Sequence, residues 1–195
     1  MRKIPVEIEN PIDNFCINIA EVTSPFFKDL NFTPNTITTF SLITGIMSIT
    51  SYIKGDYTAS AFYYFSSYIF DCCDGFYARK YDMVTDFGDR YDHYKDFLVA
   101  SILLFFIVKR YLAAKGIVRF LPFLYLIFML TQSVQVGCQE RLFNRSGEPN
   151  FLNSFKQVCP VGDDDIYDFM KTVRFGGIGT GVIFVVFLIL YSHRL

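Results

Sequence analysis

The segment from Asp71 to Asp96 reads DCCDGFYARKYDMVTDFGDRYDHYKD, and its acids and glycines recur at intervals that suit helices. On helices of 3.6 residues per turn, this segment forms two stripes, each a set of residues on one helix face. The first stripe lies within an arc of about 100° and consists of Asp71, Asp74, Gly75 and Ala78. The second stripe has i, i+4 spacing and consists of Gly88, Asp92 and Asp96. If these helices face each other, four carboxylates share one pocket.

Crowded carboxylates repel one another, so they either take up protons or are neutralised by hard divalent cations, which prefer oxygen ligands. A metal site explains this cluster best. Gly75 and Ala78 leave room for a ligand beside the helix, and Arg79 can form charge-assisted hydrogen bonds with phosphate. A single aspartate pair is usually a solvated helix end, and a lone glycine is often a packing contact. Eight specified residues within 26 positions make coincidence a poor explanation.

The chain around this segment is strongly apolar. Hydrophobic residues make up 52% of its 195 residues, and the mean hydropathy is +0.30, which is more than one ordinary soluble domain requires. The sequence therefore predicts an all-α fold, a multi-pass transmembrane helical bundle in a lipid bilayer. The five predicted spans are residues 36–53, 57–79, 88–110, 117–136 and 176–191.

The polar N-terminal part suggests a different role. We expect residues 1–34 to form an N-terminal interfacial segment and residues 35–195 to form the transmembrane domain. Within the first segment, residues 13–27 are compatible with an amphipathic helix on the membrane surface. A helix packed on the bundle explains the pattern equally well. The apolar positions at i, i+4 and i+7 are Phe15, Ile19 and Val22.

Charge and cysteine content exclude several classes of protein. The net charge of −1 provides no basic field for nucleic acid, so no nucleic-acid partner is expected. The five cysteines are odd in number and irregular in spacing, which suits neither a disulfide framework nor a zinc site. We therefore interpret all five as reduced packing residues.

The eight residues of the two stripes and Arg79 resemble the motif of the CDP-alcohol phosphotransferases (CDP-alcohol phosphatidyltransferase class I), D-x2-D-G-x2-A-R-x8-G-x3-D-x3-D. Every fixed position of that motif is matched. With Pro34 and Asn35 ahead of the first span, the likeness covers roughly residues 33–136. The resemblance implies a bundle of six helices, usually a homodimer, whereas five spans are clear in this sequence.

The same resemblance implies a membrane enzyme of phospholipid biosynthesis. Such an enzyme transfers a phosphoalcohol or phosphatidyl group from a CDP-linked donor to an alcohol acceptor and releases CMP. The implied cofactor is Mg²⁺ or Mn²⁺ at a two-metal site, and Asp96 is also the implied general base. The implied metal ligands are Asp71, Asp74, Asp92 and Asp96, and the implied CDP-binding residues are Gly75, Ala78, Arg79 and Gly88.

The nature of the donor and acceptor is less defined. Asp92-His93 resembles the branch that uses CDP-aminoalcohols, and Phe97 stands where many enzymes that use CDP-diacylglycerol have a basic residue. We expect Asp89 to be a solvated helix start, and His93 to form a local hydrogen bond rather than bind a metal. The candidate acceptor-binding residues are Arg141, Lys171 and Arg174, although charged residues at the membrane interface are the more common explanation.

The distribution of charged residues bears on the orientation in the membrane and on one alternative function. With the aspartate face in the cytosol, 12 Lys and Arg lie inside and six lie outside, which favours an active site facing the cytosol. Four of those six share the short outer loop of residues 109–119, which points the other way. Acids within spans also occur in ion or metal transporters. The acids of this chain gather at one end beside Arg79, which favours catalysis over transport.

Overall fold

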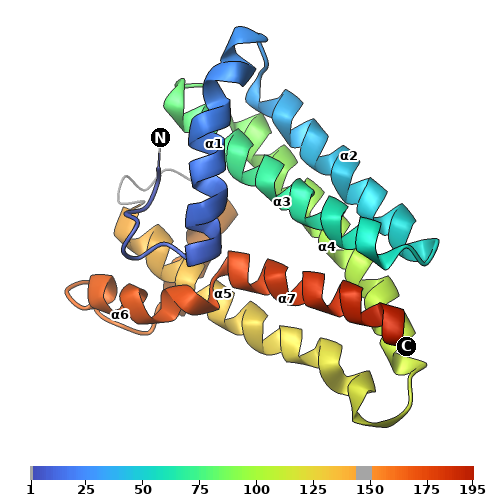
Figure 1. The fold of residues 1–195 in the computed structure, drawn as a ribbon. Helices are drawn as coiled ribbons and strands as arrows, with labels where there is room; N and C mark the ends of the chain where they lie inside the picture. The colour runs from blue at the N-terminus through green and yellow to red at the C-terminus, as the bar shows by residue number, and fades with distance from the viewer. Residues whose placement is uncertain (1, 144–150) are drawn as a thin grey trace.

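The computed structural model describes residues 2–143 and 151–195, and the regular elements in these residues are all helical. Figure 1 shows long helices gathered side by side, with α1 running across them. The α-helices are α1 (Pro11–Asp29), α2 (Pro34–Ile53), α3 (Tyr57–Lys80), α4 (Asp86–Leu112), α5 (Leu124–Phe143), α6 (Ile166–Val173) and α7 (Ile178–Tyr191). The 3₁₀ helices are η1 (Gly116–Phe123), η2 (Phe151–Val158), η3 (Arg174–Gly176) and η4 (Ser192–Arg194). The predicted all-α fold is confirmed.

Side-chain caps start the three helices that carry the motif region. Thr33, Asp56 and Thr85 each accept a hydrogen bond from a backbone N–H in the first turn of α2, α3 and α4, at 3.0–3.2 Å. Pro34 occupies the first position of α2, where its missing N–H costs nothing. These local signals explain why the helix boundaries follow the sequence punctuation closely.

Small hydroxyl residues bring α2 and α3 close together. Ser41 Oγ donates to the carbonyl of Ser67, and Ser67 Oγ donates back to the carbonyl of Ser41, both at 2.8 Å. About two turns further along α2, Ser48 Oγ donates to the carbonyl of Ser60 at 2.9 Å. Contacts between small polar residues replace the hydrophobic effect as a source of helix association in lipid. Since α2 also packs against α4, it fixes the relative position of α3 and α4.

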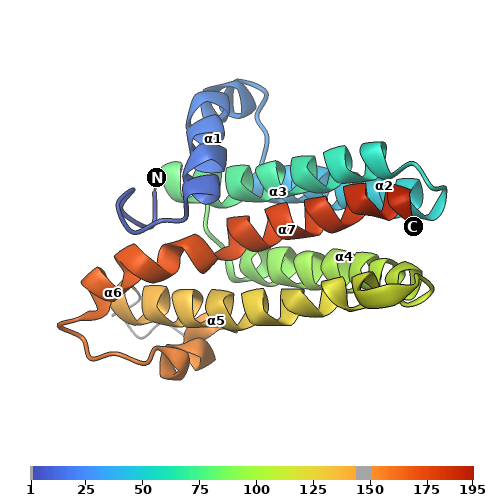
Figure 2. The same ribbon diagram turned by 60° about the horizontal axis from the view of Figure 1, so that its bottom comes forward.

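The other end of the bundle is closed by the C-terminal part of α7. The Tyr52 hydroxyl is hydrogen-bonded to Ser192 Oγ at 2.8 Å, and Tyr111 donates to the carbonyl of Leu188 at 2.8 Å. Arg110 Nε donates to the carbonyl of Ser192 at 3.1 Å. The C-terminus therefore lies beside the α2–α3 turn, as both ribbon views show (Figure 2).

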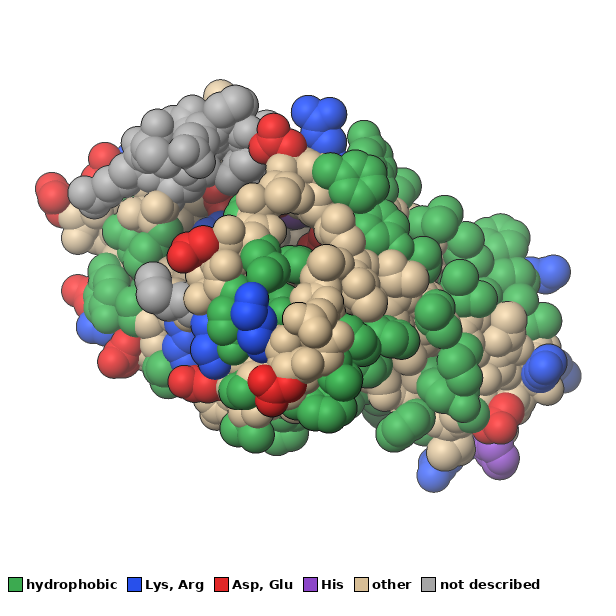
Figure 3. Space-filling view, turned by 90° about the horizontal axis from the view of Figure 1, so that it is seen from above, with side chains coloured by type: hydrophobic (Ala, Val, Ile, Leu, Met, Phe, Trp, Pro, Cys, Tyr) green, Lys and Arg blue, Asp and Glu red, His purple; other side chains and the backbone are tan. Residues whose placement is uncertain are grey.

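Within residues 2–143 and 151–195, three helical segments are long and apolar enough to cross a membrane: Pro34–Ile53, Gly116–Phe143 and Ile166–Arg194. Five clear spans are thus not confirmed. Helices α3 and α4 have 24 and 27 residues and are about 36 and 40 Å long at 1.5 Å per residue, which is long enough to span. Their charged and polar residues make them less apolar than the three segments above. Figure 3 shows one face on which hydrophobic side chains lie between two charged ends.

Helix α1 packs on the bundle with one face. Its buried residues Cys16, Ala20 and Phe27 lie on the side toward α3, and Ala20 and Phe27 join a core cluster with Tyr77. The predicted apolar stripe is on another side, where Phe15 and Val22 are 54% and 79% exposed. The packed-helix interpretation therefore describes α1, and a membrane-surface role for its exposed face is not confirmed.

The cysteine interpretation is wrong for two of the five residues. Cys138 at the end of α5 and Cys159 after η2 form a disulfide. Their separation of 21 residues carries no recognisable pattern, and they meet because η2 folds back along α5. Cys16, Cys72 and Cys73 are free, as expected.

The closeness of α2 to its neighbours yields a stability test. A Cβ atom on Gly45 would lie 2.9 Å from both methyl groups of Val99 on α4, and 3.3 Å from Ser67 Oγ. We expect Gly45→Leu to lower the free energy of unfolding by about 1–3 kcal/mol through overpacking. Thermal unfolding of the purified protein in detergent measures this change. Gly162→Leu is the control, because nothing lies within 4 Å of its Cβ position; equal melting temperatures for the two variants would contradict the packing described here.

Candidate functional site

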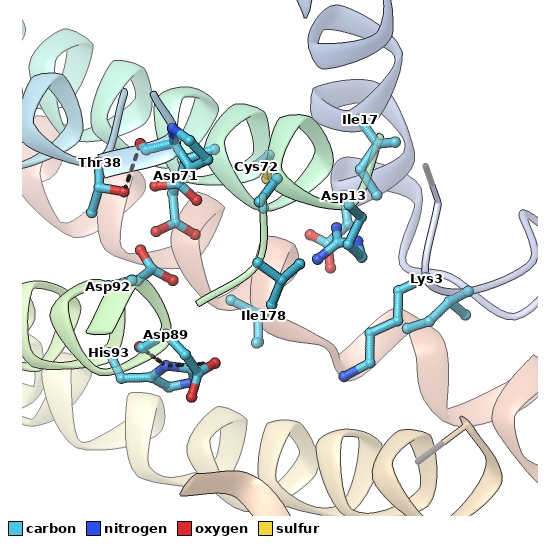
Figure 4. A pocket seen from close by; sticks show the side chains of 18 of the residues that line it. Lys3, Asp13, Ile17, Thr38, Asp71, Cys72, Asp89, Asp92, His93 and Ile178 are labelled. Atoms are coloured by element: carbon cyan, nitrogen blue, oxygen red, sulfur yellow. Dashed lines mark hydrogen bonds and ion pairs between the residues drawn. The ribbon is translucent and has the colours of Figure 1, made fainter. Parts of the chain in front are cut away.

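Two helices contribute the acids of the candidate site. Asp71 and Asp74 lie on the last turns of α3, and Asp92 lies on the second turn of α4. One carboxylate oxygen from each of the three lies within 4.8 Å of the others. In Figure 4 the labelled carboxylates of Asp71 and Asp92 face each other across the gap between the helices. The two predicted stripes therefore do meet.

This triad fits a hard divalent cation. Asp74 is only 5% exposed, and its Oδ2 atom is buried with no hydrogen-bond partner among the described residues. An orphaned carboxylate oxygen inside a protein is costly unless a cation or a ligand satisfies it. Three carboxylates at this separation, with no nitrogen or sulfur ligand among them, match the preference of Mg²⁺ and Mn²⁺ for oxygen.

Asp96, the fourth acid of the motif, lies beside this triad and shares the ion pair of Lys95 with Asp71. Its side chain is 52% exposed and is ion-paired with Lys95 at 2.6 Å. It is outside the triad of possible metal ligands and outside the lining of the cavity described below. The role implied for Asp96 as a metal ligand therefore stays a prediction.

Lys95 is a member of the site that the sequence analysis missed. Its side chain is 1% exposed, and its Nζ atom lies 2.5 Å from Asp71 and 3.2 Å from Asp92. Spacing offered a signal, because Lys95 follows Asp92 by three residues and shares its helix face. A charged residue within an acidic helix end is easily taken for a solvated one.

A cavity of about 490 Å³ opens beside the acids and contains the rest of the motif. Gly75, Ala78, Arg79 and Gly88 all line it. A Cβ atom on Gly75 would lie 3.2 Å from Arg79 Nη1, and one on Gly88 would lie 3.0 Å from Asn35 Oδ1. Glycine at 75 thus lets the guanidinium fold back over α3. Seen from above, the surface is hollowed here, with acidic atoms inside the opening (Figure 3).

The opposite wall of the cavity comes from parts of the chain that the sequence analysis did not assign to the site. Tyr68 on α3 donates a hydrogen bond to Asp13 on α1, and both line the cavity. Gln135 on α5 is 1% exposed, and no residue in the described part of the chain forms a hydrogen bond with its buried Nε2 atom. The N-terminal segment and α5 add Lys3, Glu9 and Gln139. No local pattern marks these residues, since only the tertiary fold brings them together.

The two polar neighbours of Asp92 have local roles. His93 Nδ1 lies 2.6 Å from the carbonyl oxygen of Asp89, one turn earlier in α4. The expectation of a local hydrogen bond for His93 is confirmed. Asp89 is half-buried and lines the cavity, so it is more enclosed than a solvated helix start.

The three candidate acceptor residues do not line this cavity. Arg141 pairs with Asp163 at 2.7 Å, and Lys171 pairs with Asp168 at 2.7 Å. Arg174 Nη1 donates to the carbonyl of Glu7 at 2.5 Å. The Arg174 contact ties the N-terminal segment to the C-terminal part of the chain, the Arg141 pair ties α5 to the segment before α6, and the Lys171 pair lies within α6.

Comparison with known proteins places the chain in a family. A model of the CDP-alcohol phosphatidyltransferase family matches residues 31–192 of the 195 residues. The chain therefore belongs to the CDP-alcohol phosphatidyltransferase family. No curated protein and no solved structure matches it significantly.

The family assignment settles the class of protein. Its members are transferases of phosphate-containing groups in phospholipid synthesis, and they depend on metal ions. Together with the three apolar segments, it makes the chain an integral membrane protein. The match gives no support to the transporter alternative. It also extends beyond the motif region to include α5, α6 and α7.

One acid of the cavity wall gives the fold a pH dependence. Burial, reinforced by the nearby Asp13 carboxylate, raises the pKa of Glu9 from 4.5 to about 7. The folded state then holds this proton more tightly than the unfolded state does. The free energy of unfolding should therefore fall as the pH rises from about 4.5 to 7 and level off above 7.

We expect Glu9→Gln to remove this loss, at most about 3 kcal/mol, because glutamine keeps an Oε1 acceptor for the Asn10 N–H but cannot ionise. Melting temperatures between pH 5 and 8 measure it, and the variant should exceed the wild type at pH 8 and equal it near pH 5. The exposed Glu7 provides the control variant Glu7→Gln. A pH profile of Glu9→Gln that coincides with the wild type would show that Glu9 is not buried in this way.

Proposed function

We propose that this protein transfers a phosphoalcohol or phosphatidyl group from a CDP-linked donor to an alcohol acceptor and releases CMP. The observation that carries this proposal is the meeting of Asp71, Asp74 and Asp92 in a cavity that also contains Arg79. Membership of the family supports a phosphotransferase of phospholipid synthesis, and the complete motif supports the CDP-linked donor.

Different residues of the motif bind the pyrophosphate, the nucleotide and the metal ion. Arg79 faces the cavity and suits the charge-assisted hydrogen bonds that a pyrophosphate accepts. Gly75, Ala78 and Gly88 leave the helix surfaces bare, so that the nucleotide can lie close to the backbone. Asp71, Asp74 and Asp92 would hold a Mg²⁺ or Mn²⁺ ion, which supplies charge neutralisation for the pyrophosphate and for the departing CMP.

Asp96 is the proposed general base, which takes the proton of the acceptor hydroxyl as its oxygen attacks phosphorus. Two features support this role. Asp96 completes the motif, and the ion pairs of Lys95 with Asp96 and Asp71 hold the Asp96 carboxylate beside the triad.

The wall formed by α1 and α5 is the proposed acceptor side. It presents Asp13 and Gln135 to the cavity, and Tyr68 of α3 donates a hydrogen bond to Asp13 there. Acidic and neutral polar groups suit a cationic or uncharged alcohol better than an anionic one. This agrees with the Asp92-His93 signature of the CDP-aminoalcohol branch. Acceptor binding by Arg141, Lys171 or Arg174 would require them to leave their present partners.

We further propose that the active site faces the cytosol, because most of the basic residues lie at its end of the bundle. A homodimer is proposed by analogy with the family.

Release of CMP tests the proposed function. The purified protein, given Mn²⁺ and a panel of CDP-linked donors and alcohols, should release CMP with one donor and acceptor pair. Asp74→Asn should lower the rate at least about 100-fold, because it removes a charged ligand of the triad. Asp86→Asn is the control, since Asp86 is exposed at the start of α4 and does not line the cavity. Equal rates for the wild type and Asp74→Asn would contradict the proposal.

The base role of Asp96 has a separate test. Asp96→Asn should lower kcat about 100- to 10,000-fold and leave the affinity for the donor within a few-fold, because general base catalysis contributes to the chemical step. Single-turnover kinetics with a saturating donor and donor titration measure the two quantities. Weakened donor binding with an unchanged rate at saturation would reject this role.

A further inference from the structure

Lys95 occupies an unusual position for a cation. It lies on α4, between two acids of the motif, and its side chain is 1% exposed. Its Nζ atom lies 2.5 Å from Asp71, 2.6 Å from Asp96, 3.2 Å from Asp92 and 2.9 Å from Ser41 Oγ. The ammonium group thus has four oxygen neighbours, from α2, α3 and α4.

Such an oxygen shell is what a small, hard cation requires. A lysine ammonium is a compact point charge, and a protein interior tolerates it only when opposite charges compensate it. Three carboxylates provide this compensation, and Ser41 adds a neutral acceptor. Since Ser41 is itself fixed to Ser67 of α3 by two hydrogen bonds, Lys95 is held where the three helices meet.

The lysine shares two of its carboxylates with the metal triad. Asp71 and Asp92 contact Nζ, and they also belong to the group formed with Asp74. The motif acids thus surround two adjacent places for positive charge. One place adjoins the orphaned oxygen of Asp74, and the ammonium group fills the other.

We propose that Lys95 takes the place of a second metal ion, so that this chain binds one divalent cation per active site. The proposal rests on the proposed function and deepens it. The four carboxylates of the motif carry four negative charges, and Lys95 with one divalent cation offsets three of them. A second divalent ion would need the oxygens of Asp71, Asp92 and Asp96 around it at about 2.0–2.6 Å. The Lys95 Nζ atom already lies among these three carboxylates, at 2.5, 3.2 and 2.6 Å.

The number of bound metal ions tests this proposal without any substrate. The full-length protein in detergent is titrated with Mn²⁺, and bound ions are counted by equilibrium dialysis and electron paramagnetic resonance. The wild type should bind one Mn²⁺ per chain, with the spectrum of an isolated ion. Lys95→Met should bind two, with a spin-coupled spectrum, because the vacated oxygen shell can accept an ion.

Lys109→Met is the control, because Lys109 is exposed near the other end of α4, and it should bind one ion. Two ions on the wild type, or a folded Lys95→Met that binds one, would overturn the proposal. If Lys95→Met does not fold, the wild-type count decides between one and two.

The outcomes separate this inference from the proposed function. Two ions on a wild type that releases CMP would remove the role of Lys95 and keep the function. One ion on a wild type that releases no CMP from any CDP-linked donor would keep the role of Lys95 and contradict the proposed function. No bound ion would contradict both the triad and the lysine proposal.

Discussion

The carboxylates of α3 and α4 repel one another, and this repulsion limits how the two helix ends can pack. Asp71, Asp74 and Asp92 lie close enough to share one ion, at the end of an otherwise apolar bundle. Such an arrangement is stable only when positive charge is supplied at the same place. Lys95 supplies part of that charge from within the chain, and the triad leaves room for more.

Helix α2 is the scaffold that holds this repulsive pair of helices together. Its serines bond to α3, its Gly45 admits Val99 of α4, and its Ser41 contacts the ammonium group of Lys95. Helix α2 therefore supports both the packing of the bundle and the candidate site, although it contributes no acid of its own. The polar hydrogen bonds that join α2 to α3 are of the kind that associates helices in a membrane, where apolar contacts alone favour neither partner over lipid.

The sequence predicted those features that are encoded locally. The caps and Pro34 predict the helix starts, and the motif predicts that Asp71, Asp74 and Asp92 meet, because helical periodicity fixes which side chains share a face. Features that depend on tertiary contacts were missed or wrong. The far wall of the cavity is formed by α1 and α5, and the disulfide of Cys138 depends on how η2 folds back.

The predicted number of spans is not confirmed, and Lys95 was missed, for related reasons. Helices α3 and α4 combine an apolar half with a polar functional half, so length suggests a span while composition does not. Lys95 is charged, and only its neighbours on α2 and α3 make it a buried residue. A single sequence shows neither which residues surround a side chain in the fold nor how deeply that side chain is buried.

A cation held by the two helix ends should bind the diphosphate of a CDP-linked compound. Isothermal titration calorimetry with CDP-choline and CDP-diacylglycerol, with Mn²⁺ and with a chelator, tests it most directly. We expect saturable heat for at least one of the two compounds with Mn²⁺ and none with the chelator. Equal binding under both conditions, or no binding in either, would contradict it.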